Sequence, residues 1–241
     1  MRTKLALLGL LALLGSSGAA AGPERRPPPG GYPPLPAAGA SAQAFAPRGW
    51  TVETQAEGDL DGDGTADLAF ILLAPDSAGA PSRYANPRII GIGLGRPGGG
   101  YRLVASDRRF LPPKRAPNGG SEGWMLFGKG SLDAGGGRLR IVFEYTRGHR
   151  TFTFGWRQGG LRLVGFDTAA VDGGCVRELS ANFLSSRARI GAAAIEADKP
   201  SVRWQRLPPR AGPSLEQIGP GEEFDPGGLL ARFPLTCRGA G

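Results

Sequence analysis

The sequence predicts an all-β domain, built as an antiparallel meander that forms a β-sandwich or a strongly curled sheet. Three observations support this prediction. Apolar residues recur with a period of two in 139–145 and 151–156, glycine-rich turns separate these runs, and only one short segment favours a helix. This pattern is typical of strands with one buried and one solvated face.

The best-defined strands are consecutive. Leu139, Ile141, Phe143 and Tyr145 share one face of the first run. A turn at 147–149 leads to the second run, in which Phe152, Phe154 and Trp156 alternate with threonines, and Gly159-Gly160 supplies the turn into a third strand at 161–166. Further strands are expected at 50–57, 68–73, 89–94, 101–105, 176–184 and 188–195. The helical segment is 214–218, where Ser214 is a suitable cap.

The N-terminal segment has the features of a targeting signal rather than of a folded domain. Arg2 and Lys4 precede an apolar run, and small residues follow up to Ala21, so residues 1–21 are predicted to be a signal peptide. We therefore expect a periplasmic or secreted protein with no integral membrane span. Residues 22–44 are rich in Pro, Gly and Ala and predict a disordered linker, which leaves 45–241 as one globular domain.

Charge and cysteine content limit the classes of function that the sequence supports. The net charge of +8 comes mostly from scattered arginines, and no basic stripe with interleaved aromatics predicts nucleic-acid binding. The chain has two cysteines, Cys175 and Cys237, and in an oxidising compartment a disulfide between them is favoured over a catalytic thiol or a metal pair.

The most informative stretch is 58–67, which carries four aspartates at alternating positions. Asp59, Asp61 and Asp63 occupy positions 1, 3 and 5 of a calcium-type loop, with Gly64 at the position of sharpest turn. The Thr65 carbonyl and Asp67 would complete the ligands, because position 12 holds Phe70 rather than a bidentate glutamate. The alternative is a polar Asp-Gly turn. We expect calcium here, in a strand-loop-strand setting, with folding and ion binding coupled.

The run from Gly58 to Leu68 resembles the calcium loop of FG-GAP and VCBS-type repeats, as found in integrin α-chain propellers. That resemblance implies ligand roles for Asp59, Asp61, Asp63 and Asp67, with the Thr65 carbonyl. The chain carries one such loop, whereas those propellers carry several. More broadly, segments between Phe45 and Ile195 resemble a group of exported bacterial proteins, a likeness that implies no activity.

Two functions remain open from the sequence. The first is a calcium-stabilised binding or envelope-associated module without catalytic activity, in which loops 75–87 and 110–123 meet an envelope glycan or a protein partner. The second is a hydrolase of a cell-envelope polymer with calcium as a structural ion. The only histidine, His149, is expected at an exposed turn, so carboxylate pairs such as Glu144 with Glu178, or Asp167 with Asp172, would have to act.

Overall fold

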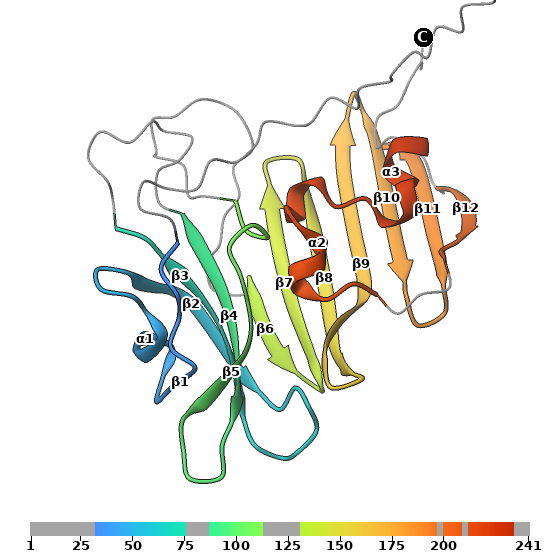
Figure 1. The fold of residues 1–241 in the computed structure, drawn as a ribbon. Coiled ribbons are helices and arrows are strands. Elements are labelled where there is room, and N and C mark those ends of the chain that lie inside the picture. Colours follow the sequence, from blue (N-terminus) through green and yellow to red (C-terminus); the bar gives the residue numbers. More distant parts are fainter. Residues whose placement is uncertain (1–31, 76–86, 113–130, 197–199, 209–211, 234–241) are drawn as a thin grey trace, which may run out of the picture.

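The computed structural model describes residues 32–75, 87–112, 131–196, 200–208 and 212–233. These residues form two antiparallel sheets, with strong curling into a half-barrel (Figure 1). The predicted all-β class is confirmed, and the strongly curled sheet is the arrangement that occurs. No helix among the described residues has both the length and the apolar character needed to cross a membrane.

The first sheet has five strands in the order β1-β5-β4-β3-β2. Their bounds are β1 Ala38–Gly39, β2 Thr51–Gly58, β3 Asp67–Leu73, β4 Arg88–Gly95 and β5 Tyr101–Asp107. The strands predicted for this half are all present. The sequence pattern missed β1, because two residues inside a proline-rich segment carry no periodicity.

The second sheet is a meander of seven strands, in sequence order from β6 to β12. Their bounds are β6 Leu132–Gly135, β7 Arg138–Tyr145, β8 Gly148–Arg157, β9 Gly160–Asp172, β10 Cys175–Asn182, β11 Arg187–Ala194 and β12 Ser201–Arg206. The predicted hairpin between β7 and β8 pairs Tyr145 with Gly148, as an antiparallel ladder requires. The strands β6 and β12 were not predicted.

The two sheets meet along β2 and β6. A Cβ atom added to Gly58 would lie 2.0 Å from the Ala134 carbonyl oxygen, so only glycine allows this close approach. The inner faces of both sheets share one apolar core, which includes Ile71, Ile92 and the large aromatic side chains Phe143 and Phe152. The two sheets therefore enclose a single core between their inner faces.

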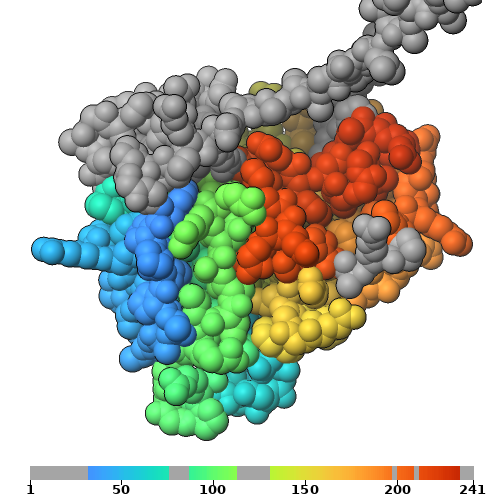
Figure 2. All heavy atoms as spheres, viewed as in Figure 1, coloured from blue at the N-terminus to red at the C-terminus, as the bar shows by residue number. Residues whose placement is uncertain are grey.

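The C-terminal elements close this interior. They are α2 Leu215–Ile218, η2 Gly221–Glu223, η3 Pro226–Gly228 and α3 Leu229–Arg232. They lie over one face of the seven-stranded sheet (Figure 1), and Leu215 and Leu229 are buried in the core. Figure 2 shows these atoms directly against those of β5, in keeping with the bond that Arg109 Nη2 donates to the Glu216 carbonyl at 3.0 Å. The predicted helix at 214–218, with Ser214 at its N-cap, is confirmed.

The outer face of the five-stranded sheet carries a second apolar cluster. Phe70 is fully buried there and stacks on Phe45, with 5.0 Å between ring centroids. Phe45 belongs to α1 Ala42–Phe45, whose first residue is also buried. Because β1 and most of α1 fall within the predicted linker 22–44, the packed domain begins earlier than the sequence suggested. Residues 1–31, including the predicted signal peptide, lie outside the described residues.

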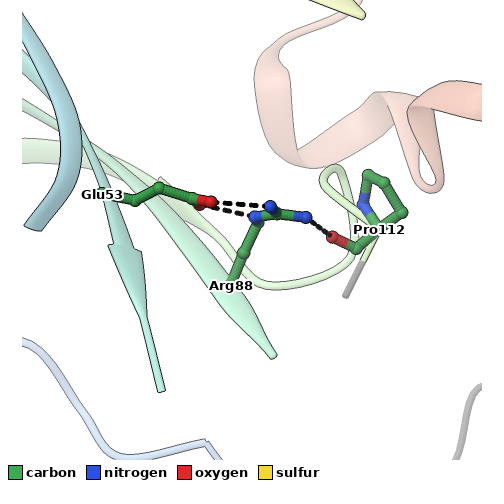
Figure 3. A network of polar contacts seen from close by, with 3 residues as sticks. All are labelled: Glu53, Arg88 and Pro112. Carbon is green, nitrogen blue, oxygen red and sulfur yellow. Dashed lines mark hydrogen bonds and ion pairs between the residues drawn. The ribbon is translucent and has the colours of Figure 1, made fainter. Parts of the chain in front are cut away.

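One buried ion pair ties the five-stranded sheet together (Figure 3). Arg88 donates from Nε and Nη2 to the two carboxylate oxygens of Glu53 at 2.6 and 2.7 Å, and from Nη1 to the Pro112 carbonyl at 3.0 Å. Glu53 sits at the irregularity of β2, between Val52 and Thr54, where the register with β3 shifts. This bulge turns the Glu53 side chain towards Arg88.

Candidate metal centre

The aspartate-rich segment is the connection between β2, which ends at Gly58, and β3, which begins at Asp67. The predicted strand-loop-strand setting is therefore confirmed. Gly58 and Asp67 are a cross-strand pair, so the loop leaves and re-enters the sheet at the same point. That point lies beside the seam between the two sheets.

Three carboxylates converge in this loop. Asp59, Asp61 and Asp67 each place one oxygen so that all three lie within 4.8 Å of one another. Oxygens at this spacing can share one cation, and an all-oxygen set suits a hard divalent ion such as calcium rather than a soft metal. The structure thus provides an acidic triad that could bind a metal, while the identity of the metal remains a proposal.

The loop backbone is shaped by its glycines and by Asp59. Gly62 and Gly64 have φ angles of +86° and +84°, which L-residues rarely adopt. Asp59 accepts the N–H groups of these same residues, at 2.7 Å from Gly62 to Oδ1 and 3.0 Å from Gly64 to Oδ2. The chain therefore wraps around the Asp59 carboxylate, as the predicted sharp turn at Gly64 requires.

Asp67 anchors the triad to the body of the domain. Its side chain is fully buried, and its two oxygens accept N–H groups from Leu60 at 2.7 Å and Gly95 at 2.8 Å. Burial raises the pKa of the Asp67 carboxyl, these hydrogen bonds oppose the rise, and the charge of Asp61 adds to it. A cation among the three carboxylates would offset both the burial and the repulsion.

The aspartate-rich loop is also anchored to the apolar core and to the end of β4. Leu60, between the first two aspartates of the loop, is buried in the common core. Gly95 lies at the end of β4, and a Cβ there would meet the Ala66 carbonyl oxygen at 2.5 Å. The loop is therefore held by the core on one side and by the β4–β5 hairpin on the other.

The other two predicted ligands are placed differently. Asp63 is exposed and is not among the three converging carboxylates; its Oδ1 accepts the Thr65 N–H at 2.7 Å. Coordination by Asp63 and by the Thr65 carbonyl stays a prediction. Asp61 likewise accepts the Asp63 N–H, at 3.1 Å. Local turns of this kind keep the carboxylates close to the loop backbone.

The carboxylate pairs considered for a hydrolase do not come together. On the solvent face, Glu144 of β7 is paired with His149 of β8, and Ala169 of β9 separates that pair from Glu178 of β10. Three strand spacings put the backbone of Glu144 about 14 Å from that of Glu178, with two other strands between them. Asp167 and Asp172 lie on opposite faces of β9, because they are five positions apart and side chains alternate along a strand. His149 is exposed as predicted, but it lies in strand β8 rather than in the turn, which is formed by residues 146–147.

The structure also has a pocket that the sequence did not reveal. It lies between β5 and the β8–β9 hairpin, measures about 270 Å³, and is lined by residues that include Arg102, Trp156 and Leu161. Trp156, the third aromatic residue of the predicted alternation in β8, packs against the core and also lines this pocket. No carboxylate or histidine of the described chain lines it. The pocket therefore gives the hydrolase hypothesis no support.

Two further predictions fall partly beyond the described residues. Cys175 is buried at the start of β10, but Cys237 lies outside the described residues, so the disulfide between them stays a prediction. Most of loops 75–87 and 110–123 lies outside as well. The described start of the second loop is not a recognition surface, because Phe110 and Leu111 are buried in the core.

Comparisons of the chain with family models, with curated proteins and with solved structures found no match.

Proposed function

We propose that this protein is an extracytoplasmic binding module whose fold is stabilised by calcium in the β2–β3 loop. The observation that carries the proposal is the convergence of Asp59 and Asp61 on the buried carboxylate of Asp67. Three like charges this close repel one another strongly unless a cation is bound among them. Calcium suits a flexible ring of oxygens better than magnesium, which demands a near-ideal octahedron.

Calcium would act here on stability rather than on a reaction. Asp67 accepts hydrogen bonds from Leu60 in the loop and from Gly95 at the end of β4, so an ion held by Asp67 connects both segments. Binding to the folded state alone raises the free energy of unfolding by mass action. Loops of this type in extracellular modules bind with dissociation constants on the order of 0.1 to 1 mM.

The resemblance of residues 58–68 to FG-GAP and VCBS-type loops supports the same conclusion. In that pattern Asp63 and the Thr65 carbonyl also contact the ion, which requires the exposed Asp63 carboxylate to turn towards the triad. The signal-like residues 1–21 support an extracytoplasmic site of action, where calcium is abundant. For the partner we propose an envelope glycan or protein that contacts loops 75–87 and 110–123 beyond Pro112.

Isothermal titration calorimetry of the full chain with calcium tests the proposal. We expect one site per chain in the wild type and weaker heats with magnesium. The variant Asp61→Asn should lose at least about ten-fold in affinity, because it removes one charged ligand. Asp133→Asn is the matched control, since Asp133 is an exposed aspartate on β6 outside the triad.

The Asp63→Asn variant then decides the ligand set. A loss similar to that of Asp61→Asn would place Asp63 in the coordination sphere, and unchanged affinity would restrict the site to the triad. Absence of calcium binding to the wild type at roughly ten times the expected dissociation constant would contradict the proposed function.

A further inference from the structure

The outermost strand of the seven-stranded sheet is an open edge. β12 pairs with β11 on one side, and no strand of the described chain pairs with its other side (Figure 1). Five of its six residues are exposed, and Gln205 is half-buried. An exposed edge of this kind presents unpaired backbone groups that another extended chain can use.

The register shows which backbone groups are free. Leu207, directly after β12, donates its N–H to the Ser186 carbonyl at 2.9 Å, on the β11 side. Because an antiparallel ladder alternates, the backbone groups of Val202, Trp204 and Arg206 point away from β11. These three residues therefore offer donors and acceptors in the plane of the sheet.

Two large apolar side chains of this edge strand are exposed to solvent. Trp204 is 54% exposed and Val202 is 46% exposed, on the face away from the core. The Arg187 guanidinium stacks over the Trp204 ring at 4.7 Å from its centroid. An aromatic ring held by an arginine is a rigid contact surface for an incoming side chain.

Charge indicates what kind of chain would pair there. β11 and β12 together contain four arginines and no acidic residue. Only Arg189 has a carboxylate partner among the described ion pairs, the Glu178 side chain at 3.2 Å. Arg206, paired with Arg187 of β11, shares the face of Val202 and Trp204, whereas Arg203 lies on the other face, over the Phe233 ring. A strand with acidic side chains would therefore meet, on either face, an arginine that has no ion-pair partner among the described residues.

The same charges oppose pairing with a second copy. If two β12 strands paired antiparallel around Arg203, the two Arg203 side chains would face each other, and in any register each strand would bring Arg203 and Arg206 but no acidic residue to the other. Like charges directly opposite in a sheet are destabilising. The terminal residues 234–241 carry one arginine and no acid, so they do not complement this edge either.

We propose that β12 is a docking edge for an extended acidic segment of a partner protein, which adds to the seven-stranded sheet as a further strand. Backbone hydrogen bonds to Val202, Trp204 and Arg206 would hold the segment, and the arginines with Trp204 would select its side chains. This inference is independent of the proposed calcium site, which lies in the other sheet.

A labelled peptide of four Glu-Val repeats is the probe, and one of four Lys-Val repeats is its charge-reversed control. Both alternate in the way a strand requires. Fluorescence anisotropy with the full chain should show saturable binding of the acidic peptide, with a dissociation constant on the order of 10 to 100 μM, and at least about ten-fold weaker binding of the basic one. High salt should weaken the acidic complex.

The variant Val202→Pro separates strand addition from simple charge attraction. It removes an N–H that points to the free edge and leaves the ladder with β11 intact. We expect at least about ten-fold weaker binding, whereas Val202→Ala should change binding by less than about two-fold. Thermal unfolding of both variants verifies that they are folded. Arg203→Glu combined with Arg206→Glu should reverse the preference between the two peptides.

Three results would overturn the proposed docking of an acidic strand. Equal binding of the acidic peptide to Val202→Pro and Val202→Ala would overturn strand addition. No binding of that peptide to the wild type at roughly 1 mM, far above the expected constant, would overturn the proposal as a whole. Sedimentation that shows a wild-type dimer dissociated by Val202→Pro would also overturn it, because the occupant would then be a second copy.

Discussion

The two sheets differ in how they are covered. The five-stranded sheet has apolar clusters on both faces, whereas the seven-stranded sheet has its core on one face and solvent on the other. The buried charged side chains of the described chain, Asp67, Arg88 and Asp107, belong to strands β3, β4 and β5 of the five-stranded sheet. A sheet covered on both sides can enclose charges, but each then needs a partner.

Two arginine–glutamate pairs show this difference most directly. The side chains of Arg88 and Glu53 in the five-stranded sheet are 2% and 9% exposed, whereas those of Arg189 and Glu178 in the seven-stranded sheet are 32% and 49% exposed. The same chemistry thus occurs in two environments. Its contribution to stability should depend on the environment rather than on the residue types.

The largest expected effect comes from breaking the buried pair. We expect Glu53→Gln to lower the free energy of unfolding by about 3 to 5 kcal/mol, because the Arg88 guanidinium stays buried without its countercharge. Glu178→Gln, the matched change in the other sheet, should cost less than about 1 kcal/mol. Urea denaturation measures both, and equal losses would contradict the contrast between the sheets.

An intermediate effect is expected at the seam where the sheets meet. Gly58→Ala places a Cβ 2.0 Å from the Ala134 carbonyl oxygen, so β2 and β6 must move apart. We expect a loss of about 1 to 3 kcal/mol by the same measurement. Gly98→Ala is the control, since no atom lies within 4 Å of the added Cβ. Similar stability of the two variants would show that the seam is not a close contact.

The smallest effect concerns Asp107, at the end of β5. Burial raises the pKa of this carboxyl above its usual range, while N–H groups of Arg109 and Phe110 oppose the rise. A raised pKa in the folded state means that the folded protein holds this proton to a higher pH than the unfolded chain does. The contribution of Asp107 to stability is therefore lost as pH rises from the pKa of this carboxyl in the unfolded chain to its higher pKa in the folded protein.

Asp107→Asn removes this titration and keeps an oxygen that can accept both N–H groups. Its stability relative to the wild type should therefore improve as pH rises above 3.8, the ordinary pKa of an aspartate, which is the direction that the linkage relation gives for a raised carboxyl pKa. Urea denaturation at several pH values checks the sign. A relative stability that declines over the same pH range would contradict a raised pKa for Asp107.

The contrast between the sheets also explains what the sequence could predict. The run 68–73 is apolar throughout, which is typical of a strand covered on both faces, and the alternation in 139–156 is typical of strands covered on one face; the structure has both. The acidic loop was placed correctly because Asp and Gly at fixed spacing specify a turn. Convergence of only three of its four carboxylates depends on side-chain directions that spacing alone does not determine.

The features that sequence reasoning missed are those set by tertiary contacts. β12 has only two apolar residues, Val202 and Trp204, and both are exposed, so this edge strand lacks the longer apolar alternation that marks a half-buried strand. Phe110 and Leu111 reach the core from a segment rich in basic residues and proline, which looked like a loop throughout. Glu53 points inward because of a bulge, and a bulge displaces the very period on which the prediction relies.

The central claim is that a divalent cation belongs among Asp59, Asp61 and Asp67. Thermal unfolding of the full chain in roughly 10 mM calcium, compared with a chelator, tests it most directly. The expected dissociation constant predicts a rise in melting temperature of about 4 to 8 °C for the wild type, and a smaller rise for Asp61→Asn. Identical melting temperatures of the wild type with calcium and with chelator would contradict the account.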